Sequence, residues 1–126
     1  MDVNVIIPEF EIHTTPLEEI FIDTTSITIM LDDINEERYK IFVQPYCAIN
    51  VVTIDCVSSQ KYYNDFCYRN GKFHRHILQI DNSIYLNELL KKMNNGQYIN
   101  ELKHYVLPLQ DNLIEFISCD IKLEKI

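Results

Sequence analysis

The stretch that decides the fold is SITIMLDDINEERYKIFVQ, which runs from Ser26 to Gln44. Apolar side chains occupy every second position in its two halves: Ile27, Ile29 and Leu31, then Tyr39, Ile41 and Val43. A period of two is typical of β-strands that bury one face. The polar run 33–37 between the halves predicts a turn. The stretch therefore predicts a β-hairpin with an acidic tip.

Further strands are predicted on the C-terminal side of this hairpin. Pro45 lacks a backbone N–H, which favours a sheet edge or a bulge at that point. Residues 47–57 predict a third strand, and their apolar phase changes between Val51 and Val52, which indicates a bulge there. The other predicted strands are 72–81, 103–109 and 113–123, the last two paired with each other.

Two helices are predicted between these strands. Residues 58–70 carry Tyr62, Tyr63, Phe66 and Cys67 at helical spacing. A second helix begins after a cap at Asp81, Asn82 or Ser83 and ends at Gly96. We therefore expect one α+β domain spanning residues 1–126, with a mainly antiparallel β-sheet and two helices packed on one face.

The charge is distributed unevenly along the chain. Residues 1–37 contain ten acidic side chains and no Lys or Arg, whereas the remainder has nine acids and eleven bases. The formal net charge of −8 therefore comes entirely from the first third. An anionic surface disfavours nucleic acid and anionic membranes as partners and favours a basic protein. The alternative is that these acids only keep a small domain hydrated.

Composition disfavours several function classes. The only two glycines, Gly71 and Gly96, are too far apart for a glycine-rich phosphate loop. No apolar run is long enough to span a membrane, and the first residues do not resemble a signal peptide. The four cysteines form no CxxC pair, and no nucleophile motif occurs. We therefore expect a cytoplasmic protein that is not an enzyme and needs no cofactor.

Histidines and tyrosines supply the remaining candidates. His74 and His76 share one face of a predicted strand and could bind a metal with His104 or Asp81, although hydrogen-bonded surface histidines are commoner. Tyr62 and Tyr63 are adjacent in a predicted helix, so one of them is a candidate interface anchor.

Three C-terminal segments carry a family resemblance: ILQIDNS at 77–83, KHYVL at 103–107 and DNLIEFIS at 111–118. Together they resemble small bacterial proteins that include immunity proteins of contact-dependent inhibition and related polymorphic toxin systems. The resemblance implies a cytoplasmic protein that binds the C-terminal domain of a cognate toxin and blocks its active site. It implies no catalytic residues and maps no contact residues.

The resemblance and the charge asymmetry lead to one expectation. A nuclease toxin has a cationic cleft, which clustered carboxylates can occupy in place of nucleic acid. The expected toxin-binding residues are Glu18, Glu19, Asp23, Asp32, Asp33, Glu36, Glu37, Tyr62 and Tyr63. Two alternatives stay open: a generic acidic interaction module or phage-type inhibitor, and a small metal-dependent or acid–base enzyme that uses His74 and His76.

Overall fold

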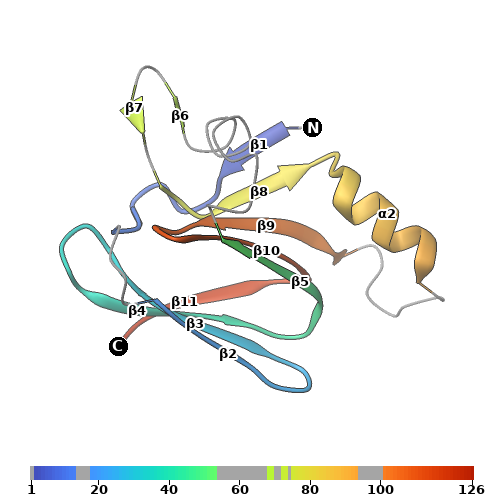
Figure 1. Cartoon of the computed structure of the whole chain (residues 1–126), viewed down its shortest axis with the longest axis horizontal. Coiled ribbons are helices and arrows are strands. Elements are labelled where there is room, and N and C mark those ends of the chain that lie inside the picture. The colour runs from blue at the N-terminus through green and yellow to red at the C-terminus, as the bar shows by residue number, and fades with distance from the viewer. Residues whose placement is uncertain (1, 14–17, 54–67, 70–71, 74, 94–100) are drawn as a thin grey trace.

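The computed structural model describes residues 2–13, 18–53, 68–69, 72–73, 75–93 and 101–126 (Figure 1). Within these ranges the chain forms two larger antiparallel sheets, a two-stranded ribbon and one helix. The described helix is too short to span a bilayer.

The first sheet has five strands in the order β1-β8-β9-β10-β5. Their bounds are Asp2–Val5 for β1, Leu78–Asp81 for β8, Lys103–Pro108 for β9, Asn112–Ser118 for β10 and Tyr46–Thr53 for β5. The predicted pairing of the last two sequence segments is confirmed for β9 and β10, since Leu113 lies opposite Pro108 and Ser118 opposite Lys103. The prediction of one strand over 113–123 is wrong, because β10 ends at Ser118 and Ile121–Lys125 forms a separate strand in the second sheet.

The second sheet has four strands in the order β11-β4-β3-β2. Their bounds are Ile121–Lys125 for β11, Arg38–Val43 for β4, Ile27–Asp32 for β3 and Glu19–Ile22 for β2. The predicted hairpin is therefore confirmed as β3 and β4, with Ile27 opposite Val43 and Asp32 opposite Arg38.

The main core lies between the two sheets. Alternate side chains of β3 and β4 meet alternate side chains of β9 and β10, as period-two strands with one buried face require. The fully buried members of these strands include Ile29, Ile41, Leu107 and Phe116. A second apolar cluster, formed by Leu78, Ile80, Val106 and Leu113, lies on the other face of the five-stranded sheet.

The chain crosses from one sheet to the other twice, between β4 and β5 and between β10 and β11, and both crossings lie at the same corner. The chain leaves β4 and enters β5 through a cis Gln44–Pro45 peptide bond, and it leaves β10 and enters β11 after Ser118. The β5–β10 register shifts between Ile117 and Ser118, at this corner. Bends and bulges of this kind let strands switch sheets in a sandwich. The irregularity in β5 therefore lies at Tyr46–Ala48. The prediction of a bulge at Val51 and Val52 is wrong, because both residues pair with β10 without a register shift.

The expected architecture of one sheet with two helices on one face is wrong. The strands are mostly antiparallel as expected, but they form two packed sheets, and the described residues contain only the helix α2, Ile84–Lys92. The physical reason is that alternation shows which face of a strand is buried but not whether a helix or another sheet covers it. Here the buried face of each large sheet packs largely against the other sheet.

The two predicted helices have different outcomes. Most of the segment 58–70 lies outside the described residues, but Tyr68–Arg69 forms strand β6, which pairs with β7 at Lys72–Phe73, so the predicted last helical turn is wrong. The second helix is confirmed as α2, and Ser83 is its N-cap. It ends at Lys92 with Met93 as C-cap, before Gly96, which lies outside the described residues.

Candidate functional site

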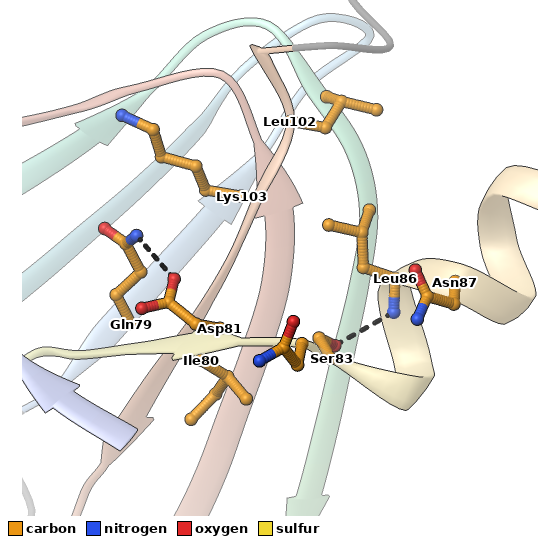
Figure 2. Close-up of a pocket in the computed structure, with 9 residues that line it drawn as sticks. Gln79, Ile80, Asp81, Ser83, Leu86, Asn87, Leu102 and Lys103 are labelled. Atoms are coloured by element: carbon orange, nitrogen blue, oxygen red, sulfur yellow. Dashed lines mark hydrogen bonds between the residues drawn. The ribbon is translucent and has the colours of Figure 1, made fainter. Parts of the chain in front are cut away.

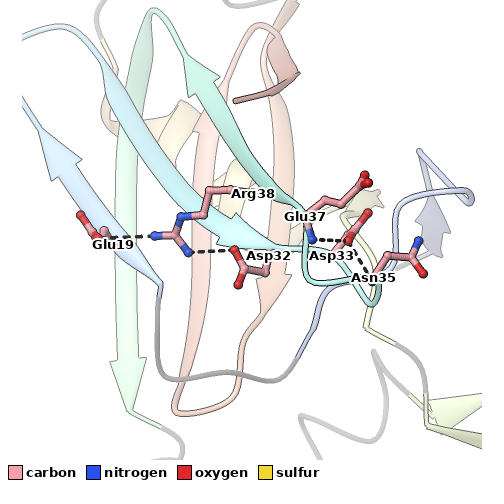
Figure 3. Close-up of polar contacts among 6 residues, drawn as sticks. All are labelled: Glu19, Asp32, Asp33, Asn35, Glu37 and Arg38. Atoms are coloured by element: carbon pink, nitrogen blue, oxygen red, sulfur yellow. Dashed lines mark hydrogen bonds and ion pairs between the residues drawn. The ribbon is translucent and has the colours of Figure 1, made fainter.

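The turn between β3 and β4 is organised by Asp33 (Figure 3). Its Oδ1 accepts the backbone N–H of Asn35 at 2.9 Å and that of Glu37 at 3.0 Å. Asp33 is only 7% exposed, so its carboxylate serves the turn rather than the surface. Glu36, in the same turn, has φ of 63° and is exposed; its backbone N–H donates to the carbonyl oxygen of Asp33 at 2.9 Å, and its side chain has no hydrogen bond or ion pair among the described residues.

Arg38 lies between two of the predicted carboxylates (Figure 3). Its Nη1 is 3.0 Å from Oδ1 of Asp32, and its Nη2 is 3.4 Å from Oε1 of Glu19. β2 and β4 flank β3, which carries Asp32, so the three charged groups lie across one face of the sheet. Two carboxylates share one guanidinium, which leaves this trio with a net charge of −1.

Two further predicted carboxylates lie at the same end of the four-stranded sheet. Oε2 of Glu37 is 3.0 Å from Nζ of Lys125, and this contact raises the pKa of Lys125. Oε1 of Glu18 accepts the backbone N–H of Gln110 at 3.4 Å, and Glu18 directly precedes β2.

These six acids define a surface that we call the acidic end: Glu18, Glu19, Asp32, Asp33, Glu36 and Glu37. Against the two bases that contact them, Arg38 and Lys125, the six carboxylates leave a net charge of −4. Ile34 lies in the same turn and is 52% exposed. An exposed apolar side chain among charged groups is the usual composition of a binding surface with an apolar centre and a polar rim.

Asp23, the seventh predicted acid, lies at the opposite end of the β2–β3 hairpin. Its Oδ1 accepts the backbone N–H groups of Thr25 at 2.9 Å and Ser26 at 2.8 Å. These two bonds hold the pKa of Asp23 below its usual range. Asp23 therefore has a local role in its turn, and the structure does not bring it to the acidic end.

The aromatic and histidine candidates are only partly placed. Tyr62, Tyr63 and His74 lie outside the described residues. His76 lies beside the N-terminal segment, where its Nδ1 is 2.9 Å from the carbonyl oxygen of Phe10. Within the described ranges, no three His, Cys, Asp or Glu side chains group as a metal site would require.

A buried polar cluster on the other face of the five-stranded sheet was not foreseen. Oγ of Ser83 is 2.7 Å from Nδ1 of His104, and Nε2 of His104 is 3.3 Å from Oε1 of Glu115. The Nε2 contact is a close approach without hydrogen-bond geometry. The ring of Tyr85 lies against His104, and burial, followed by the charge of Glu115, raises the pKa of Tyr85.

This cluster has the residue types of a Ser-His-Glu relay, but its contacts suit a structural role. Ser83 is 2% exposed, and its Oγ also accepts the N–H of Leu86 at 3.0 Å to cap α2 (Figure 2). A serine that caps a helix and bonds a buried imidazole has no exposed oxygen for a substrate. The cluster therefore anchors the start of α2 to β9 and β10.

The cavity beside Ser83 is small and open. It measures about 230 Å³ and lies where β8 runs into α2 (Figure 2). Its lining is Gln79, Ile80, Asp81, Asn82, Ser83, Leu86, Asn87, Leu102 and Lys103. Gln79 donates to Asp81 at 3.3 Å, so part of its polar lining is already paired. Its volume is below that of typical ligand pockets.

Sequence signals existed for some of these placements. Asp33 and Asp23 each precede other polar residues in a short turn, and aspartates in such turns commonly accept nearby backbone N–H groups. Nothing local in the sequence indicated the contact of His104 with Glu115, because it requires knowing that β9 and β10 place both side chains on the same face.

Comparisons with protein-family models, with curated proteins and with solved structures found no match for this chain.

Proposed function

We propose that this protein is an immunity protein, which binds a basic toxin domain in the bacterial cytoplasm and blocks its active site through the acidic end. The observation that supports this most directly is the gathering of six carboxylates around two bases that contact them within the described residues, with exposed Ile34 among them. A toxin that cleaves nucleic acid needs cationic side chains for phosphate, and this surface is complementary to them.

The structure divides the acids by what they can contribute to binding. Asp33 is bound to its own turn, and Asp32 is paired with Arg38 and largely covered. Glu18 is half-buried and accepts one long bond from the backbone N–H of Gln110, the Glu36 side chain is exposed with no contact among the described residues, and Glu37 is exposed with one surface ion pair. Glu19 is exposed too, but it shares Arg38 with Asp32. Glu18, Glu36 and Glu37 are the acids expected to steer a basic partner and to pair with it.

The test is a triple variant in which Glu18, Glu36 and Glu37 are all changed to Gln. A matched control changes three exposed acids elsewhere, as Glu88→Gln, Glu101→Gln and Asp111→Asn, and removes the same charge. Both are co-expressed with the toxin domain encoded beside this gene, and cell growth and binding affinity are measured at several salt concentrations.

We expect the acidic-end variant to lose protection, to bind at least tenfold more weakly and to show a smaller salt dependence, while the control behaves as wild type. Equal behaviour of the two variants would contradict the proposal, as would the absence of any toxin gene beside this one.

A further inference from the structure

β2 is an edge strand whose outward hydrogen-bonding groups can be assigned. The N–H of Asp23 donates to the carbonyl oxygen of Ser26 at 3.0 Å, which makes this pair the hydrogen-bonded start of the β2–β3 ladder. In an antiparallel ladder such pairs alternate with non-hydrogen-bonded ones. The register then places Phe21 and Glu19 in bonded pairs, so the N–H and C=O groups of Ile20 and Ile22 face away from β3.

Nothing in the described part of the chain pairs with this outer edge. The sheet order ends at β2, and Figure 3 shows Glu19 on the outermost strand. β2 pairs with β3 without a register shift and contains no Lys or Pro, so a bulge, a lysine and a proline do not protect it; its short length and Glu19 are the protecting features it has. Two adjacent large apolar side chains flank the edge, Phe21 at 54% and Ile22 at 52% exposed.

The charges around β2 favour one kind of occupant. Glu18 and Glu19 lie at the start of the strand and Asp23 follows its end. If two copies of the chain paired antiparallel through β2, Glu18 and Glu19 of one copy would approach Asp23 of the other, and like charges would repel. A strand that carries Lys or Arg would instead place opposite charges at both ends.

We propose that the outer edge of β2 accepts an extended, basic segment of the partner protein as an added strand. Such a segment bonds to the N–H and C=O groups of Ile20 and Ile22, packs apolar side chains on Phe21 and Ile22, and places cations near Glu18, Glu19 and Asp23. The inference rests on the proposed function for its partner, and β2 adjoins the acidic end through Glu18 and Glu19.

The experiment uses the full chain and, as the probe, a synthetic eight-residue Lys-Val peptide with four central Val and two Lys at each end, so that Val side chains reach both faces of β2. Amide hydrogen exchange of the protein is followed by NMR with and without peptide. Control peptides replace Lys with Glu, or carry N-methyl groups on all backbone nitrogens so that neither edge can donate a hydrogen bond. Two variants are compared: Ile22→Pro removes one outward N–H that β3 does not use, and Ile22→Val keeps it.

We expect the Lys-Val peptide to slow exchange at Ile20 and Ile22 at least tenfold and to leave Phe21, whose N–H faces β3, unchanged. The Glu-Val and N-methylated peptides give no such protection. Ile22→Pro weakens peptide binding about two- to tenfold, as loss of one hydrogen bond predicts, and Ile22→Val does not.

Two results would overturn the inference. Peptide binding without protection of Ile20 and Ile22 would show a purely electrostatic contact elsewhere, even if the variants of the acidic end still lose toxin protection. Concentration-dependent protection of both amides without peptide would show that a second copy occupies the edge. If the peptide slows exchange at these amides but the protein neutralises no toxin, the strand addition would be supported and the proposed function would be contradicted.

Discussion

Asp33 provides the clearest separation between folding and binding at the acidic end. We predict that Asp33→Ala destabilises the protein strongly, whereas Glu36→Ala, three residues further on and equal in charge change, leaves stability within about 0.5 kcal/mol. The difference arises because the Asp33 carboxylate is buried and bonded to its turn, while the Glu36 side chain is exposed and has no hydrogen bond or ion pair among the described residues.

The magnitude follows from the two bonds that Asp33 accepts, at 2.9 Å from Asn35 and 3.0 Å from Glu37. A hydrogen bond to a charged group contributes about 1.5 to 3 kcal/mol, and the turn is only partly shielded from water. We therefore take the lower half of the range for the two bonds and expect a loss of about 3 to 4.5 kcal/mol in the free energy of unfolding. Asp33→Asn keeps an acceptor oxygen and should lose less.

The assay is urea denaturation followed by far-ultraviolet circular dichroism, with equal denaturant slopes required before the midpoints are compared. The reasoning would be refuted if Asp33→Ala and Glu36→Ala unfolded at the same urea concentration. A confirmed difference has a practical consequence: variants that test partner binding must keep Asp33, because its loss disturbs the surface they are meant to probe.

Three other side chains, Glu36, His104 and Asp23, have definite expected effects on stability. Glu36 has φ of 63°, so Glu36→Gly should stabilise the protein by about 1 kcal/mol in urea denaturation, and a loss of stability would contradict this. His104→Leu removes the 2.7 Å hydrogen bond between its Nδ1 and the buried Oγ of Ser83 and should cost about 1 to 3 kcal/mol by the same assay, whereas a near-zero change would make the cluster dispensable. The folded-state pKa of Asp23 lies below its ordinary value of 3.8, so its stabilising effect is present above that value and is lost as the pH falls through the folded pKa. The melting temperature of Asp23→Ala should therefore be below that of wild type at neutral pH, and the gap should close in strong acid; a gap independent of pH would contradict the assignment.

The strand pattern could be predicted from the sequence because alternation depends only on local spacing. Ile27, Ile29 and Leu31 are all buried in the main core, as their period of two required. The strands β1 and β2 were not foreseen, because each has only four residues and so short a run carries little periodic signal. Which surface covers the buried faces is a tertiary property, and so the two-sheet packing could not be read from periodicity.

The location of the candidate site could be predicted from the sequence, but the contacts within the site could not. Charge counting found the acids, and the β2–β3 and β3–β4 registers bring six of them to one end of the sheet. It could not show that Asp33 and Asp23 accept backbone N–H groups, or that Arg38 and Lys125 neutralise part of the surface, because these contacts depend on turn geometry and on strands distant in sequence.

The most direct test of the docking claim is amide hydrogen exchange of this protein alone and in complex with the toxin domain encoded beside its gene. We predict slowed exchange along β2 and through the Asp33–Glu37 turn, with α2 unaffected. Slowed exchange confined to α2 and the cavity beside Ser83, with β2 and the turn exchanging as in the free protein, would contradict this prediction.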